Sequence, residues 1–151
     1  MYEQVNPDQN MAAYTAQLVE TLLRDMAFSI RKTVKNPDEE NIHDLRVLCL
    51  RLRYAVRLFA RLFPRKPARR IRKRLSAVQD LLAAVRSCDI ALQVLAVESI
   101  AAALVARQKK KLASELGLAR RRALRPLQAR LKKMQRADAL QRWRSRLIPP
   151  V

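Results

Sequence analysis

Residues 42–59, IHDLRVLCLRLRYAVRLF, combine two opposite chemistries in one short segment. An α-helix advances about 100° per residue, so the large apolar side chains here gather on one side: Leu45, Leu48, Leu52, Val56, Phe59 and, just beyond, Phe63. The opposite side carries the basic residues His43, Arg46, Arg53, Arg57 and Arg61, with Arg51 off to one side. The segment therefore predicts a helix that is anchored in a core by one face and presents basic side chains on the other.

The whole chain is strongly basic. Its 151 residues include 32 Lys and Arg against 13 Asp and Glu, a formal net charge of +19. Such an excess predicts a polyanionic partner: nucleic acid, an acidic membrane surface or a phosphate polymer. Arginine outnumbers lysine, which favours forked hydrogen bonds to phosphate oxygens. Because Gly117 is the only glycine, glycine-rich phosphate-binding loops are close to excluded, and side chains must meet any phosphate.

Cysteine and histidine usage argues against a metal site. Cys49 and Cys88 lie within apolar helical patterns, so we expect buried, reduced thiols. With a single histidine there is no ligand set for zinc, and we expect no cofactor. Residues 1–10 lack the pattern of a secretory signal, which predicts a cytoplasmic protein. Residues 91–106 are apolar nearly all round but shorter than the roughly 20 residues of a membrane span, so we interpret them as a buried bundle helix.

The expected fold is a single all-α domain over residues 1–151, an antiparallel bundle of about five or six helices. Two Asn-Pro-Asp stretches predict helices that begin near 7, running to about Lys35, and near 37. The second helix is expected to end at Phe63, before Pro64. A third covers about 67–86 and, like the first, carries a stripe of apolar residues at helical spacing. A fourth continues from 91 toward a cap at Gly117. Residues 118–151 are expected to form basic helices, broken or kinked at Pro126, with a new start signal at Asp138. Their packing stays open: they could be a solvated extension or a surface for a partner chain.

The basic face of residues 42–59 has two interpretations. An ordinary solvated face is the usual one for a charged stripe. Here, however, the arginines of the stripe have no acidic partner three or four residues away. The stripe also continues into RKPARRIRKR at residues 65–74, and it begins early in a helix, where the dipole disfavours cations. These features favour an anion-binding surface. His43 alone is more often structural, but on this stripe it is a hydrogen-bond donor for phosphate. No nucleophile or paired carboxylate shares its face, so we expect no enzyme activity.

Two stretches of the sequence resemble a known family. Residues 43–47 (HDLRV), followed by RLR at 51–53 and LF at 58–59, resemble the signature helix of the CHAD family, the conserved histidine alpha-helical domains. Residues 75–95 are similar to its second motif, LQdxLGxxRDxDV, through Leu75, Gln79, Asp80, Leu82, Arg86, Asp89 and Ile90. Together these stretches cover about a third of the chain.

The resemblance implies an all-helical domain that binds inorganic polyphosphate on a basic surface, without known catalysis, often on polyphosphate granules. The family's basic positions correspond here to His43, Arg46, Arg51 and Arg53. To these we add Arg57 from the helical stripe and Arg86 from the second motif, although pairing of Arg86 with Asp89 is an equal alternative. A CHAD domain commonly has two similar halves, whereas this chain has the histidine helix once. We therefore hypothesise a homodimer whose two-fold axis restores the missing half.

Two other functional classes remain open at this stage. A non-specific nucleic-acid-binding protein is compatible with the charge, although aromatic side chains for stacking are few and no helix-turn-helix pattern is present. The third class is an assembly module whose basic face docks an acidic protein partner. Neither class predicts a membrane span.

Overall fold

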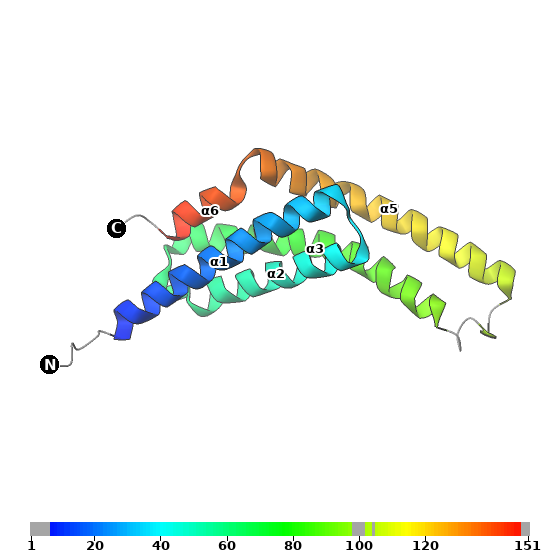
Figure 1. The fold of residues 1–151 in the computed structure, drawn as a ribbon, viewed down its shortest axis with the longest axis horizontal. Coiled ribbons are helices and arrows are strands. Elements are labelled where there is room, and N and C mark those ends of the chain that lie inside the picture. Colours follow the sequence, from blue (N-terminus) through cyan, green and yellow to red (C-terminus); the bar gives the residue numbers. More distant parts are fainter. Residues whose placement is uncertain (1–6, 98–101, 104, 149–151) are drawn as a thin grey trace.

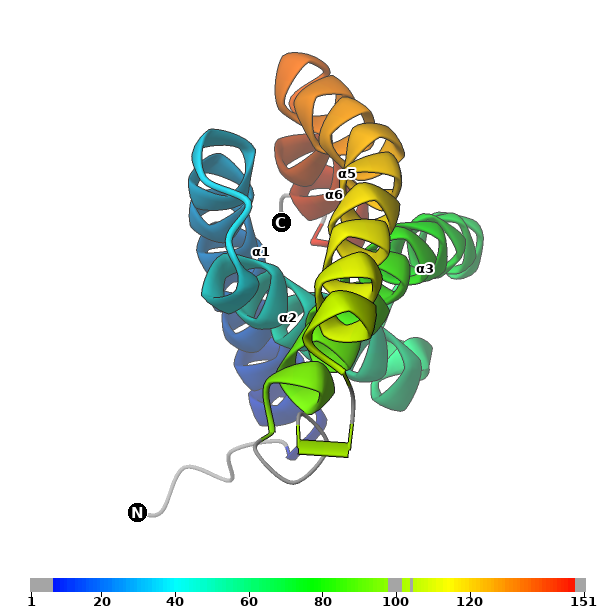
Figure 2. The same ribbon diagram turned by 90° about the vertical axis from the view of Figure 1, so that its right-hand side faces the viewer.

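A computed structural model describes residues 7–97, 102, 103 and 105–148. In this range the chain is helical and has no strand, which confirms the predicted all-α antiparallel bundle (Figure 1). The elements are α1 (Pro7–Lys35), α2 (Glu39–Leu58), a short 3-10 helix η1 (Ala60–Leu62), α3 (Arg65–Ala96), α5 (Ala106–Arg136) and α6 (Ala139–Leu147). Each long helix packs on the next one along the chain, and α6 packs on α1 and α3 (Figure 2).

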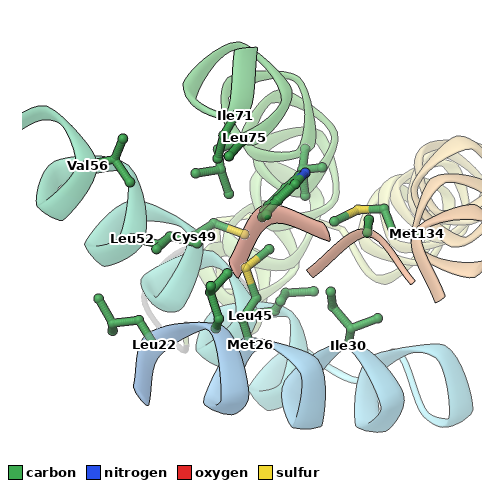
Figure 3. Close-up of a cluster of buried hydrophobic side chains, with 14 of the residues drawn as sticks. Leu22, Met26, Ile30, Leu45, Cys49, Leu52, Val56, Ile71, Leu75 and Met134 are labelled. Atoms are coloured by element: carbon green, nitrogen blue, oxygen red, sulfur yellow. The ribbon is translucent and has the colours of Figure 1, made fainter. Parts of the chain in front are cut away.

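The predicted apolar face of α2 lies in the core. Leu45, Leu52 and Val56 are fully buried, whereas Leu48 and Phe59 are partly covered. This face packs between α1 and α3, whose apolar stripes were also predicted (Figure 3). Full burial of one such aliphatic side chain stabilises a fold by about 1.5–3 kcal/mol. The buried core positions of the two neighbouring helices are Val19, Leu22, Leu23, Met26 and Ile30 of α1, and Ile71, Leu75, Val78, Leu82 and Val85 of α3.

The C-terminal helices belong to the same core. The second half of α5 and all of α6 bury one side against α1 and α3. Trp143 is among the largest fully buried side chains of the described residues. Residues 118–151, whose packing the sequence left open, thus contribute core residues up to α6: Leu127, Leu131, Met134, Ala139, Trp143 and Leu147.

The start of α2 differs from the prediction by two residues. Asn36 was expected to cap the helix, but Asp38 is the N-cap, and its carboxylate accepts a hydrogen bond from the backbone N–H of Asn41 at 2.8 Å. Asn36 supports this cap by donating from Nδ2 to Oδ2 of Asp38 at 3.1 Å. Asn and Asp are both favourable N-cap residues, so the sequence alone did not show which of the two caps α2. At its other end α2 stops at Leu58, and η1 replaces the expected last turn.

Two predicted helix boundaries are wrong, and of the two alternatives predicted at Pro126, a break or a kink, the break is excluded. The chain does not interrupt its helix between 86 and 91, because α3 continues to Ala96. Gly117 is not a cap and lies in the middle of α5, which also continues through Pro126. Burial of Leu127, Leu131 and Met134 beyond the proline, at about 1.5–3 kcal/mol each, outweighs the local cost of about 1 kcal/mol for the glycine and about 3 kcal/mol for the proline. The predicted new start at Asp138 is confirmed, since α6 begins at the next residue.

The apolar segment 91–106 is not a buried helix. Its first part ends α3, residues 98–101 and 104 lie outside the described residues, and Val94, Val97 and Val105 are exposed. Among the described helices, none combines the length and apolarity needed to cross a membrane. Both cysteines are free, but only Cys49 is buried, and Cys88 is half-buried. Burial raises the pKa of the Cys49 thiol to about 12.

Candidate anion-binding surface

Five of the six predicted site residues project from α2 into solvent. We call them the α2 basic set: His43, Arg46, Arg51, Arg53 and Arg57, all exposed. Their exposure follows from the same periodicity that buries the opposite face. Arg86, the sixth residue, comes from α3 and is partly covered. The structure therefore brings the six residues to the outer side of two neighbouring helices.

One part of the α2 basic set borders α3. Nη1 of Arg53 donates to Oε1 of Gln79 on α3 at 2.9 Å. Arg46 precedes Arg53 by seven residues, about 10 Å along the same side of the helix. On α3, Arg72 and Arg86 lie seven residues before and after Gln79 and so follow the same side of that helix. The boundary between α2 and α3 thus forms one cationic strip.

The other part of the α2 basic set faces α1. His43 and Arg51 line an open groove of about 770 Å³ between α1 and α2. We call it the α1–α2 groove. Helix α1 contributes the cations Arg24, Arg31 and Lys32 to its lining. These three were not among the site residues predicted from the sequence. Its lining residues are Arg24, Asp25, Phe28, Ser29, Arg31, Lys32, His43, Asp44, Val47, Leu48 and Arg51.

Phe28 is the aromatic residue of this groove, and its side chain is exposed. Two cations already lie over its ring, Arg31 Cζ at 5.9 Å and Lys32 Nζ at 5.6 Å from the ring centre. Such contacts are attractive because the ring face is electron-rich. They hold the two cations at the groove and compete with any base for the face of the ring.

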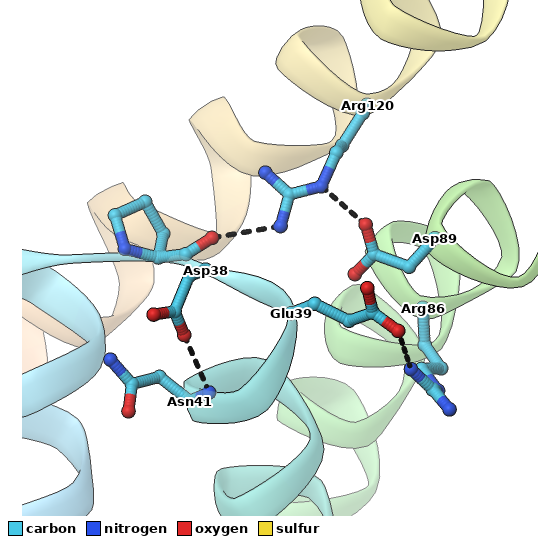
Figure 4. A network of polar contacts seen from close by, with 7 residues as sticks. Asp38, Glu39, Asn41, Arg86, Asp89 and Arg120 are labelled. Carbon is cyan, nitrogen blue, oxygen red and sulfur yellow. Dashed lines mark hydrogen bonds and ion pairs between the residues drawn. The ribbon is translucent and has the colours of Figure 1, made fainter. Parts of the chain in front are cut away.

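A network of polar contacts fixes the end of the bundle next to this surface (Figure 4). Nη1 of Arg86 is 3.3 Å from Oε1 of Glu39, at the start of α2. Asp89 pairs instead with Arg120 of α5, whose Nε lies 2.5 Å from Oδ1 of Asp89, while its Nη2 donates to the carbonyl oxygen of Pro37 at 2.8 Å. The alternative of an Arg86–Asp89 pair is therefore wrong. Asp89 and Arg120 join α3, α5 and the α1–α2 loop.

Little of the positive charge is neutralised within the fold. Within residues 9–97 and 105–148, three ion pairs link one side chain to another: Arg86–Glu39, Arg120–Asp89 and Arg144–Glu20. None of them involves the α2 basic set. Within the described part of the chain, no three His, Cys, Asp or Glu side chains are grouped so that they could hold a metal ion. The chemistry of this surface is thus multiple guanidinium donors facing solvent from neighbouring helices.

Comparison with known proteins identifies one family. The family model of the CHAD domain matches residues 17–151, which include both motifs and all four long helices from the middle of α1 onward. No curated protein and no solved structure matches the chain significantly.

Proposed function

The chain belongs to the CHAD domain family, and from this membership we propose that it binds inorganic polyphosphate on the α2 basic set and the cations beside it. The proposed mechanism is electrostatic capture without catalysis. Arginine side chains grip phosphate oxygens through forked, charge-assisted hydrogen bonds. We further propose that the protein acts in the cytoplasm, in association with polyphosphate granules.

One observation supports this proposal above the others. Arg46, Arg53 and Arg57 project from the exposed side of a helix whose other side packs in the core, and among the described residues none of the three has a carboxylate partner. A structural role in ion pairing would require such partners. A row of guanidinium groups on a rigid helix, without carboxylates to neutralise them, instead suits a flexible chain of repeated phosphates.

Electrostatic capture predicts how affinity depends on polymer length and on salt concentration. The spacing of about 10 Å between Arg46 and Arg53 exceeds the reach of a single phosphate, so a long polymer gains from several contacts at once. Long chains should therefore bind far more tightly than pyrophosphate. Affinity should also fall steeply with salt, because each neutralised phosphate releases a counterion.

The experiment compares two variants that carry the same net charge. Arg46→Ala/Arg53→Ala removes two guanidinium groups from the α2–α3 boundary, whereas Arg142→Ala/Arg146→Ala removes two exposed ones from α6. Both variants and the wild type are titrated with long-chain polyphosphate at two salt concentrations. We expect the first variant to lose at least about tenfold in affinity and the second much less. Equal losses would indicate diffuse attraction by net charge and refute a site on α2.

The same titration, run with DNA of equal charge, addresses the nucleic-acid alternative. Displacement of polyphosphate by modest amounts of DNA at physiological salt would favour that alternative. Phe28 gives it little support, because two cations already lie over its ring. An acidic protein partner would be favoured instead if a purified complex survived treatment with exopolyphosphatase and nuclease.

A further inference from the structure

Two helices extend beyond the body of the bundle as a hairpin. The α1–α2 loop meets α3 and α5 at Asp89 and Arg120. Past this level α3 and α5 continue together, away from α1 and α2 (Figure 1). We call this extension the arm; its described residues are 90–97, 102, 103 and 105–119. A hairpin of two helices has only one partner for each apolar stripe, whereas stable helical units usually enclose a core between more helices.

The arm exposes apolar side chains in unusual number. Of the twelve exposed large hydrophobic residues in the described part of the chain, six lie on it. Two of them, Val94 and Leu112, line a groove of about 430 Å³ between the two helices. Contiguous apolar surface of this kind marks an interaction site. The groove is lined by Ala91, Val94, Leu95, Leu112, Glu115, Leu116 and Ala119, and Ile90 lies beside Val94 on α3.

This flank is also poor in charge, in contrast to the rest of the chain. On α3 the arm has no charged residue from 90 to 97, and Glu115 is the one charged residue that lines the groove. In a chain with a net charge of +19, two copies repel each other over most of their surface. The lining of this groove is where two copies can approach with the least repulsion.

We propose that the arm is a self-association surface, through which two copies of this chain form a symmetric dimer. Docked by the same flank across a two-fold axis, two hairpins make a four-helix unit with Val94 and Leu112 in its interior. The flank also carries an acid and a cation that suit such a contact, since Lys111 lies one helical turn before Glu115 on α5. An acidic residue of one copy can therefore face a cation of the other. This inference does not depend on polyphosphate being the ligand.

The test measures the oligomeric state of the full chain, freed of polyanions, by sedimentation over a range of protein concentrations. Val94→Glu places a carboxylate in the proposed contact at a site that is 46% exposed in the single chain, so the fold tolerates it. Leu58→Glu, at an exposed residue on the end of α2, makes the same kind of change far from the arm. We expect a dimer whose dissociation constant rises at least about tenfold in the first variant and stays unchanged in the second.

Salt dependence separates this proposal from the binding function. Salt screens the repulsion between two basic copies and strengthens apolar contact, so the dimer should become tighter as salt rises. Polyphosphate binding should respond in the opposite direction. A monomeric wild type at every soluble concentration, a dimer unaffected by Val94→Glu, or a dimer that salt dissociates would overturn the proposal. None of these results would bear on polyphosphate affinity, which is measured in its own titration.

Discussion

Removal of the Arg120 guanidinium should destabilise the bundle without touching the proposed site. Asp89 is 4% exposed and the Arg120 side chain 20% exposed, so the pair is largely shielded from water. Arg120→Met leaves the Asp89 carboxylate buried without its cation. Breaking such a pair from one side typically costs about 3–5 kcal/mol. Because Arg120 retains some solvent contact, we expect a loss near the lower end, about 3 kcal/mol in the free energy of unfolding.

The second partner of Arg120 adds a smaller contribution. The carbonyl oxygen of Pro37 loses a donor at 2.8 Å, which costs about 1 kcal/mol if water does not replace it. The double variant Asp89→Leu/Arg120→Met removes both charges together. Replacement of a whole buried pair by apolar side chains is often close to neutral, so the double variant should recover most of the stability that the single variant loses.

Urea unfolding, followed by far-ultraviolet circular dichroism, measures both effects. Arg121→Met is the matched control, because Arg121 is the exposed neighbour and carries the same charge. Polyphosphate affinity is measured on the same samples and should be alike for Arg120→Met and Arg121→Met. The reasoning fails if Arg120→Met unfolds within about 1 kcal/mol of the control, since a buried unpaired carboxylate costs more than that.

Three further predictions concern α5, the core and the α1–α2 groove. Gly117→Ala should raise stability by about 1 kcal/mol in thermal denaturation, because the residue lies within α5 and an added Cβ meets no atom within 4 Å. Burial raises the pKa of Cys49 from 9.0 to about 12, so its contribution to stability is complete below pH 9.0 and is lost as the pH rises toward 12. Relative to Cys49→Ala, the wild type should lose up to about 1.4 kcal/mol of unfolding free energy per pH unit in that window, measured by urea titration. Arg24→Ala/Arg31→Ala should lower polyphosphate affinity and flatten its logarithmic salt dependence by roughly one to two units; an unchanged slope would exclude the groove from the binding surface.

Helical periodicity made the core and the exposed face of α2 predictable. Leu45 and Leu52 share one side of the helix and Arg46 and Arg53 the other, whatever the neighbouring helices do. The same reasoning located the buried stripes of α1 and α3. Periodicity is a local property of the chain, so a single sequence is sufficient to predict it.

Helix ends and groove partners depend on residues far apart in the sequence. A polar residue such as Asp89 normally weakens a helix interior, but here Arg120, 31 residues away, pairs with it and α3 continues. The sequence alone places Arg24 and Arg31 on one side of α1, because they are seven residues apart, with Phe28 between them. Their position opposite His43 required knowledge of which face of α1 packs on α2. Such long-range pairings are decided by packing, which local propensity does not describe.

The uninterrupted course of α3 has a mechanical consequence. The helix contains 32 residues and is therefore about 48 Å long. It carries Arg72 near one end and Val94 near the other, with no loop between them that could absorb a rotation. Long helices bend only gently. A small tilt of α3 at the end that carries Arg72 therefore displaces the end that carries Val94. If the proposed polyphosphate binding and the proposed self-association both hold, one continuous helix connects the two surfaces.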